Sequence, residues 1–589
     1  MEFSMFMKLS AVCETKFHYQ DKIPPSDYVV DIASNMQFYP VKDWLAGSSL
    51  PFKFSPHVIH MILDQLSPDN VRIFWESKCF EGLTDKVEPW YGTAYSLEKI
   101  TGSMIQGWMA SAPDENMHLP APNKFIPTDL SLKTVQEKEK FPVLLSRSTY
   151  SALWYKPDTL FSTPKAYVKI DFNCPYAGSS PEADVAGLYY SINDTDGGFQ
   201  VTLLGYNHKL RILLETIVEQ IATFEVKTDR FSVIKEMVTK EYQNFKYQQP
   251  YQQAMYYCSL ILQDQTWPLI EQLDILPALQ VEDVAKFVPL MLSRTFNEIF
   301  CTGNIESHEA ESMVKHIEDV LFNCSKPLCK PLFSSQHLAN RVIKLENGTS
   351  YFYPSECLNP ENENSALVHY IQVGRDDFKL NVKLQLFALV AKQPTFHQLR
   401  SVEQLGYITV LLQRNDCGIR GLQFIIQSTV KAPGNIEQRV EAFLKMFETT
   451  LYEMTIDEFK VDMPVLILSN VNALIDMKLE KHKNLREESS FFWREIDDGT
   501  LRFDRKDHEV EALRQLTLHE LIDFFNEYVK VGAPRKKTLS VRVHGNRHSS
   551  EYKSEVSEPH LARIDNIFTF RRSQSLYGSF KGLSGQMKL

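Results

Sequence analysis

The sequence predicts an α+β fold of tandem homologous domains, each an antiparallel sheet packed with helices. The first observation behind this prediction is an internal repeat, and the second is that each copy contains two apolar strands followed by an amphipathic helix. The 589 residues, 43% hydrophobic and 23% charged, are typical of a folded protein and sufficient for roughly three to four domains.

The repeat places Gly198 opposite Gly421, at an offset of 223 residues, and each glycine begins an apolar strand. In the sequence that follows, apolar residues recur three and four positions apart. This spacing predicts a helix over 210–224 in the first copy and over 436–451 in the second.

A second strand precedes each glycine, over 188–192 in the first copy and over 407–412 in the second. Asn-Asp-Thr-Asp-Gly-Gly and Asn-Asp-Cys-Gly stand between the paired strands, and these are turn-forming residues. We therefore expect a hairpin in each copy.

Short apolar strands are predicted to close the structural units, at 296–301, at 539–544 and, for an earlier unit, at 71–75. A proline-rich stretch separates the earlier unit from the first copy, and a polar, serine-rich stretch after the second copy is expected to be a loosely attached tail. The predicted segments are 1–112, a linker at 113–145, 146–330, 331–547 and a tail at 548–589.

The two copies differ in length. Ala166 and Ala366 are 200 residues apart, whereas Gly187 and Gly406 are 219 apart, so the first copy is about 19 residues shorter between these anchors. The missing piece corresponds to a predicted helix over 384–400. We expect a helix deletion near residue 185, with local destabilisation around Pro175 to Val185, because a sheet that loses a covering helix exposes apolar surface.

Composition excludes several classes of protein. The net charge of −11 argues against nucleic acid as a partner, and no apolar run approaches the roughly 20 residues that cross a membrane. The start of the chain lacks the pattern of a secretory signal. Nine scattered cysteines without a C-x-x-C pair indicate reduced thiols in a reducing compartment.

Metal and nucleophile motifs are missing from the sequence: H-E-x-x-H, H-x-x-E-H, G-x-S-x-G and the phosphate-binding loop do not occur. His57 and His60 stand three residues apart, and His308 stands near Glu309 and His316. Solvated helix surfaces explain both groups better than metal ligation does, so we expect no zinc ligands in this chain.

The segment 396–407 is the richest in chemistry. It runs from a helix end into a strand, and Gly406 permits a tight entry for Tyr407. On the residues alone, the favoured interpretation is a helix-to-strand junction with Arg400 paired to Glu403 on the surface.

A resemblance changes that interpretation. Leu399-Arg400 with Glu403-Gln-Leu-Gly-Tyr407, Gly421-Leu-x-Phe-Ile-Ile-Gln-Ser428, Trp90-Tyr-Gly-Thr-x-Tyr95 and Pro122-Asn-x-Phe-Ile-Pro-Thr128 resemble the insulysin (insulin-degrading enzyme) family of pitrilysin-type zinc metalloendopeptidases. The resemblance extends from about Ser4 to about Val543. It implies four homologous domains in two halves of a clam-shell chamber. Segment 1–112 then corresponds to the end of the second domain, 146–330 to the third and 331–547 to the fourth.

By this resemblance, Arg400 and Tyr407 match residues that reach across the chamber to the catalytic zinc site, and Phe396 matches an aromatic residue of the same wall. A guanidinium and a phenol can stabilise the oxyanion that forms when a peptide bond is hydrolysed. The family binds zinc through an H-x-x-E-H helix of the first domain, and that motif is missing here.

The resemblance therefore implies the peptide-binding, C-terminal portion of a zinc metalloendopeptidase, inactive alone because it lacks zinc ligands. Its expected partners are unfolded or short peptides and a catalytic N-terminal half or homologous subunit, with a homo-oligomer as a further option. The alternatives are a non-catalytic scaffold or regulatory binding subunit, or a truncated splice or gene-model product. Met587-Lys588-Leu589 resembles a peroxisomal address, so the expected location is peroxisomal or cytoplasmic.

Overall fold

The computed structural model describes residues 3–51, 53–112, 123–134, 139–172, 189–195, 198–264, 266–324, 327–332, 341–456, 465–554 and 561–581. The chain divides into two compact units. The first unit comprises Met1–Thr128 with Val185–Gly187, and the second comprises Asp129–Asp184 with Leu188–Leu589.

The described part of the first unit contains four α-helices and one antiparallel pair of short strands: α1 (Phe3–His18), α2 (Pro25–Phe38), α3 (Pro56–Leu63), α4 (Gly102–Ala110), β1 (Lys86–Val87) and β2 (Ala94–Tyr95). Phe125 is the one buried residue in its described part. The strand predicted at 71–75 is wrong, since this stretch pairs with no strand in the described part and Trp75 is 78% exposed. Alternating apolar residues form a strand only where another strand is present to pair with them.

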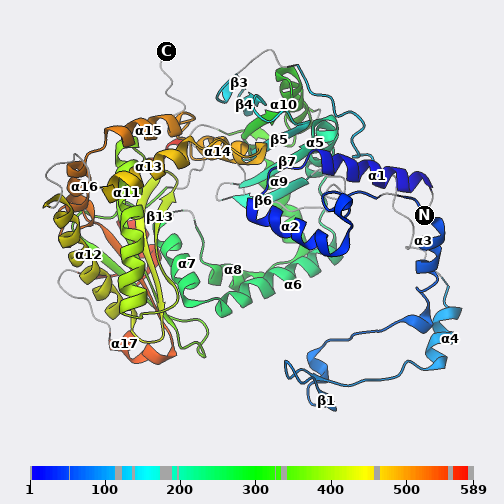
Figure 1. The fold of residues 1–589 in the computed structure, drawn as a ribbon, viewed down its shortest axis with the longest axis horizontal. Coiled ribbons are helices and arrows are strands. Elements are labelled where there is room, and N and C mark those ends of the chain that lie inside the picture. The colour runs from blue at the N-terminus through cyan, green and yellow to red at the C-terminus, as the bar shows by residue number, and fades with distance from the viewer. Residues whose placement is uncertain are drawn as a thin grey trace. The chain divides into compact units, whose positions relative to one another are not determined.

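Two six-stranded sheets form the frame of the second unit (Figure 1), so the predicted α+β class is confirmed. The prediction of antiparallel sheets is wrong, because each sheet contains parallel as well as antiparallel strand pairs. The first sheet has the order β3-β4-β9-β5-β7-β6, and the second has the order β13-β14-β12-β15-β11-β16. The strands of the first sheet are β3 (Val143–Arg147), β4 (Ser151–Pro157), β5 (Lys165–Phe172), β6 (Tyr189–Thr195), β7 (Gly198–Tyr206) and β9 (Asn297–Gly303). Those of the second are β11 (Ser350–Glu356), β12 (Ser365–Arg375), β13 (Thr409–Asp416), β14 (Ile419–Ser428), β15 (Thr538–His544) and β16 (Leu561–Arg563). A further short parallel pair joins β8 (Arg294–Thr295) to β10 (Lys330–Pro331).

Helices connect and cover these strands. In the first half of the unit they are α5 (Asn207–Ala222), α6 (Thr228–Asn244), α7 (Pro250–Leu262), α8 (Leu269–Ile275), α9 (Val281–Leu292) and α10 (Ser307–Leu321). In the second half they are α11 (Phe378–Thr395), α12 (Pro433–Ile456), α13 (Val465–Leu479), α14 (Leu485–Asp497), α15 (Arg505–Gln515), α16 (Leu518–Phe524), α17 (Ser549–Ser554) and α18 (Ile567–Ser573). Two π-helices continue α11 and α16: η8 (Phe396–Val402) and η9 (Phe525–Val529).

The repeat is confirmed by topology. The hairpin β6–β7 leads into α5, and the hairpin β13–β14 leads into α12. Cys417 and Gly418 form the second turn with φ values of 45° and 79°, the left-handed conformation that a two-residue hairpin loop needs. Strands β9 and β15 close the copies, as expected, and the structure places both in the interior of their sheets.

Each sheet is covered on one face by a helix from the other half of the unit. In the second sheet, alternate side chains of β12 face opposite ways: Leu367 joins the core under α11 and α12, while Val368 joins a core that includes α7. Conversely, Trp493 of α14 packs with Trp154 and Phe300 of the first sheet. Figure 1 shows α7 beside the second sheet and α14 beside the first. This exchange fastens the two sheets together.

The shortening of the first copy is visible in the strand positions. Residues 173–188 connect β5 to β6, whereas the longer stretch 376–408 connects β12 to β13 and contains the predicted helix as α11 and η8. The predicted helix deletion near 185 lies outside the described residues.

The expected loose tail is wrong for residues 561–581. Strand β16 pairs with β11 in parallel, and Ile567 and Phe570 of α18 are buried in the core that includes α7. The apolar residues of this segment are too few to show a period in the sequence, but they pack against a core formed by other elements.

Candidate functional site

The site begins with the helix that carries it. Asp377 caps the start of α11 by accepting a hydrogen bond from the backbone N–H of Leu380 at 2.9 Å. Just before this cap, the buried Asp376 accepts hydrogen bonds from Arg505 at 2.7 Å and from Asn381 at 2.8 Å. Arg420 also donates to the same carboxylate, at 2.9 Å.

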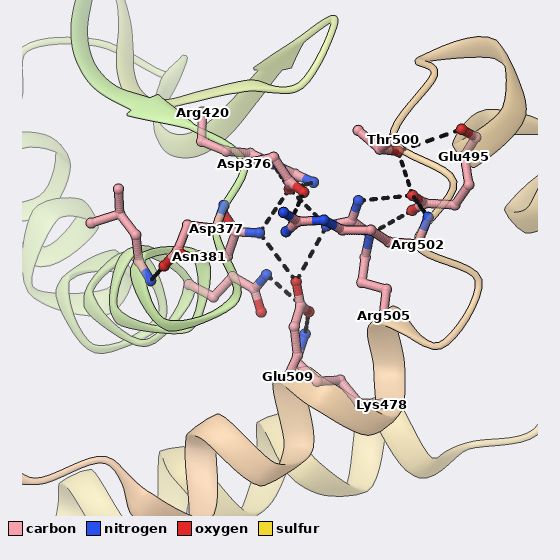
Figure 2. Close-up of polar contacts among 12 residues, drawn as sticks. Asp376, Asp377, Asn381, Arg420, Lys478, Glu495, Thr500, Arg502, Arg505 and Glu509 are labelled. Atoms are coloured by element: carbon pink, nitrogen blue, oxygen red, sulfur yellow. Dashed lines mark hydrogen bonds and ion pairs between the residues drawn. The ribbon is translucent and has the colours of Figure 1, made fainter. Parts of the chain in front are cut away.

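These contacts keep Asp376 ionised. Burial alone would raise the pKa of its carboxyl group, but the hydrogen bond and charge of Arg505, with the charge of Arg420, lower that pKa to about 2. Figure 2 shows the Arg505 guanidinium between Asp376 and Glu495, and Arg505 donates to both carboxylates. The start of α11 is thereby tied to α14 and α15.

At its other end, α11 changes into the π-helix η8. Pro394 has no backbone N–H and its ring clashes with the preceding turn, so the regular series of α-helical backbone hydrogen bonds is interrupted there. Thr395 donates its hydroxyl to the carbonyl of Ala391 at 2.7 Å. The wider turn then extends to Val402, a local geometry often found at functional sites.

A tight turn follows η8 and leads into β13. Leu399 and Leu405 are fully buried and fix the turn to the core, and Gln404 adopts a φ of 51°. At Gly406, a Cβ atom would lie 1.8 Å from the carbonyl oxygen of Gln427 on β14. The predicted tight entry is confirmed, and its physical cause is this contact between two backbones.

The three predicted site residues meet beside this turn. The Arg400 guanidinium lies 4.5 Å from the centre of the Phe396 ring and 4.4 Å from the centre of the Tyr407 ring. Tyr407 is 82% exposed and Phe396 is 38% exposed, while Arg400 is half-buried. Stacking on two aromatic faces holds the cation without consuming its hydrogen-bond donors.

The predicted ion pair between Arg400 and Glu403 is wrong. Glu403 binds Arg439 of α12 through two hydrogen bonds of 2.7 and 2.8 Å and accepts a third from Gln398 at 2.9 Å. The hydrogen bond from Arg439 lowers the pKa of Glu403, and burial of the carboxylate raises it. The net result is a lowered pKa. Arg400 has no carboxylate within 4 Å in the described part of the chain.

Sequence reasoning missed Arg439 and Gln398. Gln398 is part of the segment 396–407, but an amide next to a basic residue gives no special signal. Arg439 lies 36 residues after Glu403, on the face of an amphipathic helix where a charged residue is ordinarily explained by solvent.

The site can bind and polarise an oxygen atom. A guanidinium stacked on a tyrosine ring offers, together with the hydroxyl of that tyrosine, several donors to a carbonyl or carboxylate oxygen. No group of three or more histidine, cysteine, aspartate or glutamate side chains suited to a metal is found among the described residues. His57 and His60 are exposed on α3, and His308 is exposed with Glu306 at 3.2 Å.

Comparison with protein families identifies two matches. A family model described as the middle or third domain of peptidase M16 matches residues 17–185 and 181–275. A second, described as the C-terminal lobe domain 4 of a PQQ synthase PqqF-like protein, matches 386–493. The candidate site lies within the second match. Among the helices that the structure describes, none is long and apolar enough to cross a membrane.

Curated relatives match nearly the whole chain. It is 65% identical to "Insulin-degrading enzyme-like 1, peroxisomal" of Arabidopsis thaliana over 99% of its length, and 34% identical to the insulin-degrading enzyme of Homo sapiens over 92%. The chain spans 62% of the first relative and 54% of the second.

The fold agrees with a solved structure. The crystal structure of pitrilysin matches 98% of this chain, with a TM-score of 0.76 and 22% sequence identity. A structure described as a peptidase M16 inactive domain, from Pseudomonas fluorescens, matches 69% of the chain with a TM-score of 0.50 and 10% identity. By sequence, the chain is homologous to the C-terminal portion of insulysin-like M16 peptidases, and it shares the fold of pitrilysin.

Proposed function

We propose that this chain is the peptide-binding portion of an insulysin-like metalloendopeptidase, and that it works together with a catalytic half. It supplies chamber wall and transition-state contacts, and it is inactive alone. Its substrates are short or unfolded peptides, and its partner is a homologous half that carries the metal site.

The observation that carries this proposal is the state of Arg400. Its guanidinium stacks on the rings of Phe396 and Tyr407, has no carboxylate partner in the described part of the chain, and lies next to an exposed phenol. A cation that serves only stability is normally paired or fully solvated. An arginine held in place with unused donors is suited to bind a ligand.

The chemistry of peptide hydrolysis uses such donors. Attack on a peptide carbonyl builds negative charge on its oxygen, and donors fixed in advance at that position stabilise the charge without reorganising. Arg400 is proposed to donate to this oxygen, with Tyr407 donating beside it. Phe396 orients the guanidinium by stacking and contributes to substrate contact.

Zinc, the metal of the resembled family, does not fit the described residues of this chain, because none of them gathers into a suitable ligand group. The proposal therefore assigns any zinc site to the partner half, and leaves to this chain the binding of the peptide and of its carbonyl oxygen.

A complementation experiment tests the proposal. The purified chain is mixed with the N-terminal portion of the Arabidopsis thaliana relative, and hydrolysis of a quenched fluorescent peptide is followed. We expect turnover only from the mixture. Arg400→Ala should lower kcat/KM by about 10²–10³-fold, as loss of an oxyanion donor does, and Tyr407→Phe should lower it less.

Arg211→Ala is the matched control, because Arg211 is an exposed arginine paired with Glu215 on α5. It should leave turnover unchanged. Turnover that survives Arg400→Ala at full rate contradicts the catalytic role. Binding of the partner without any turnover would favour the scaffold or regulatory subunit.

We also propose a peroxisomal location. The name of the 65% identical relative includes this compartment, and the chain ends in Met587-Lys588-Leu589, which lies outside the described residues. A fluorescent protein fused to the N-terminus should accumulate in peroxisomes and lose that location when these three residues are removed. An unchanged distribution contradicts the proposal.

A further inference from the structure

The contacts of Glu403 explain why Arg400 is left unpaired. Glu403 stands three residues after Arg400, a spacing at which a carboxylate and a guanidinium on a helix can reach each other. Both of its oxygens are nevertheless occupied, by Arg439 at 2.7 and 2.8 Å and by Gln398 at 2.9 Å. The side chain of Glu403 is 12% exposed, so little of the carboxylate is left for another donor.

We infer that Arg439 is a positioning residue for Arg400: by binding Glu403 from α12, it prevents this carboxylate from neutralising the guanidinium. The inference rests on the proposed function, since it concerns the availability of Arg400 for a peptide oxygen. It goes further, because it assigns a role to a residue of another helix that touches no substrate.

The geometry of the pair favours this role. Arg439 presents two nitrogens to two oxygens, the bidentate arrangement that gives the strongest carboxylate pairs. The backbone N–H of Glu403 donates to the carbonyl of Gln398, whose side-chain amide also binds the carboxylate. Glu403 is therefore held at the end of η8 by Gln398 and turned toward α12 by Arg439.

Removing Arg439 should release the carboxylate. Glu403 would then be an ionised group beside Arg400, and the attraction between them would draw the guanidinium away from the two rings. In Arg439→Ala, Arg400 is still present, but we expect its guanidinium to be paired with Glu403 and no longer available to a ligand. A second substitution, Glu403→Gln, removes the negative charge and should release Arg400 again.

Rescue distinguishes this mechanism from a structural role. In the complementation assay, Arg439→Ala should lower kcat/KM by about 10-fold or more, approaching Arg400→Ala. The double variant Arg439→Ala with Glu403→Gln should recover most of the lost activity. If Arg439 only fastened η8 to α12, the double variant would be no better than the single one, and that result would overturn the inference.

A second readout does not depend on turnover. With 3-fluorotyrosine placed at Tyr407, the ¹⁹F chemical shift reports whether the guanidinium lies against the ring. Arg439→Ala should move this shift toward that of Arg400→Ala, and the double variant should restore it. An unchanged shift in Arg439→Ala overturns the inference.

The two readouts also separate this inference from the proposed function. If no variant shows turnover with the partner half but the ¹⁹F shifts change and recover as described, the proposed function fails and the role of Arg439 stands.

Discussion

Among single residues, Gly406 decides where Tyr407 can lie. The chain passes so close to β14 at this point that a Cβ atom on Gly406 would meet the Gln427 carbonyl oxygen at 1.8 Å and its carbon at 3.0 Å. Both neighbours are backbone atoms, which cannot turn aside as a side chain can. Any side chain here must push the turn outward, and Tyr407 would move with it.

Gly406→Ala is therefore expected to affect both stability and the site. Forcing an extra carbon into a packed region typically costs about 1–3 kcal/mol, which corresponds to a decrease in melting temperature of several degrees. It should also separate Tyr407 from Arg400 and lower turnover in the complementation assay. Calorimetry and peptide hydrolysis measure the two effects.

Gly374→Ala is the matched control for that substitution. A Cβ atom on Gly374 would meet only a Leu380 side-chain carbon, at 3.7 Å, so it fits without displacing the backbone. This variant should keep the melting temperature and the activity of the parent. Equal losses in both variants would show that the close approach at Gly406 is not the cause.

At the same scale, the sequence predicts which residues meet in the site but not how they are paired. The motif brings Phe396, Arg400 and Tyr407 together, as found. Proximity along the chain predicts Arg400 as the partner of Glu403, and the structure assigns Glu403 to Arg439 on α12 instead. Spacing along one helix cannot indicate a partner that only the packing of two helices brings near.

Helices and strands are predicted correctly where the apolar pattern is long and the element packs against other elements of the same repeat. The helices at 207–222 and 433–456 and the two hairpins follow from periodicity and turn residues, because each segment buries a face against its own repeat. The stretch 71–75 also contains alternating apolar residues, but it pairs with no strand in the described part of its unit. A local pattern is therefore not sufficient for a strand.

The exchange of α7 and α14 between the sheets lies beyond sequence reasoning. A buried ion pair accompanies the packing of α14 on the first sheet: Lys156 of β4 lies 3.1 Å from Glu488 of α14. The two residues are 332 positions apart in the sequence. Both side chains are almost fully buried, so each needs the other to compensate for lost hydration. In the sequence they are two ordinary charged residues.

Across the whole second unit, the C-terminal segment 561–581 joins the two sheets. After α18, the Phe580 ring lies 4.2 Å from the Arg375 guanidinium and covers Gly418 at the tip of the β13–β14 hairpin. The next residue, Lys581, lies 3.1 Å from Asp497 of α14 and 3.6 Å from Asp171 of β5. One cation therefore contacts the first sheet and the helix that covers it.

This contact makes the junction sensitive to pH. Burial, together with the nearby carboxylates of Asp497 and Glu298, raises the pKa of Asp171 to about 6 against the attraction of Lys581. In the unfolded chain the Asp171 carboxyl has its ordinary pKa of 3.8. Between pH 3.8 and about pH 6 this carboxyl is therefore protonated in the folded state but ionised in the unfolded chain. Its contribution to stability is therefore largest at low pH and falls as the pH rises through about 6.

Lys581→Met should consequently cost little stability at about pH 5, where Asp171 is largely protonated, and more at about pH 8, where an ionised Asp171 has lost its cation. We expect the decrease in melting temperature relative to the parent to be several degrees larger at the higher pH. Lys240→Met is the control, because Lys240 forms an exposed pair with Glu236 and should show a small effect at both pH values. A decrease for Lys581→Met of equal size at both pH values would mean that Lys581 stabilises the junction through Asp497 and by packing over Gly499, and that the charge of Asp171 plays no part.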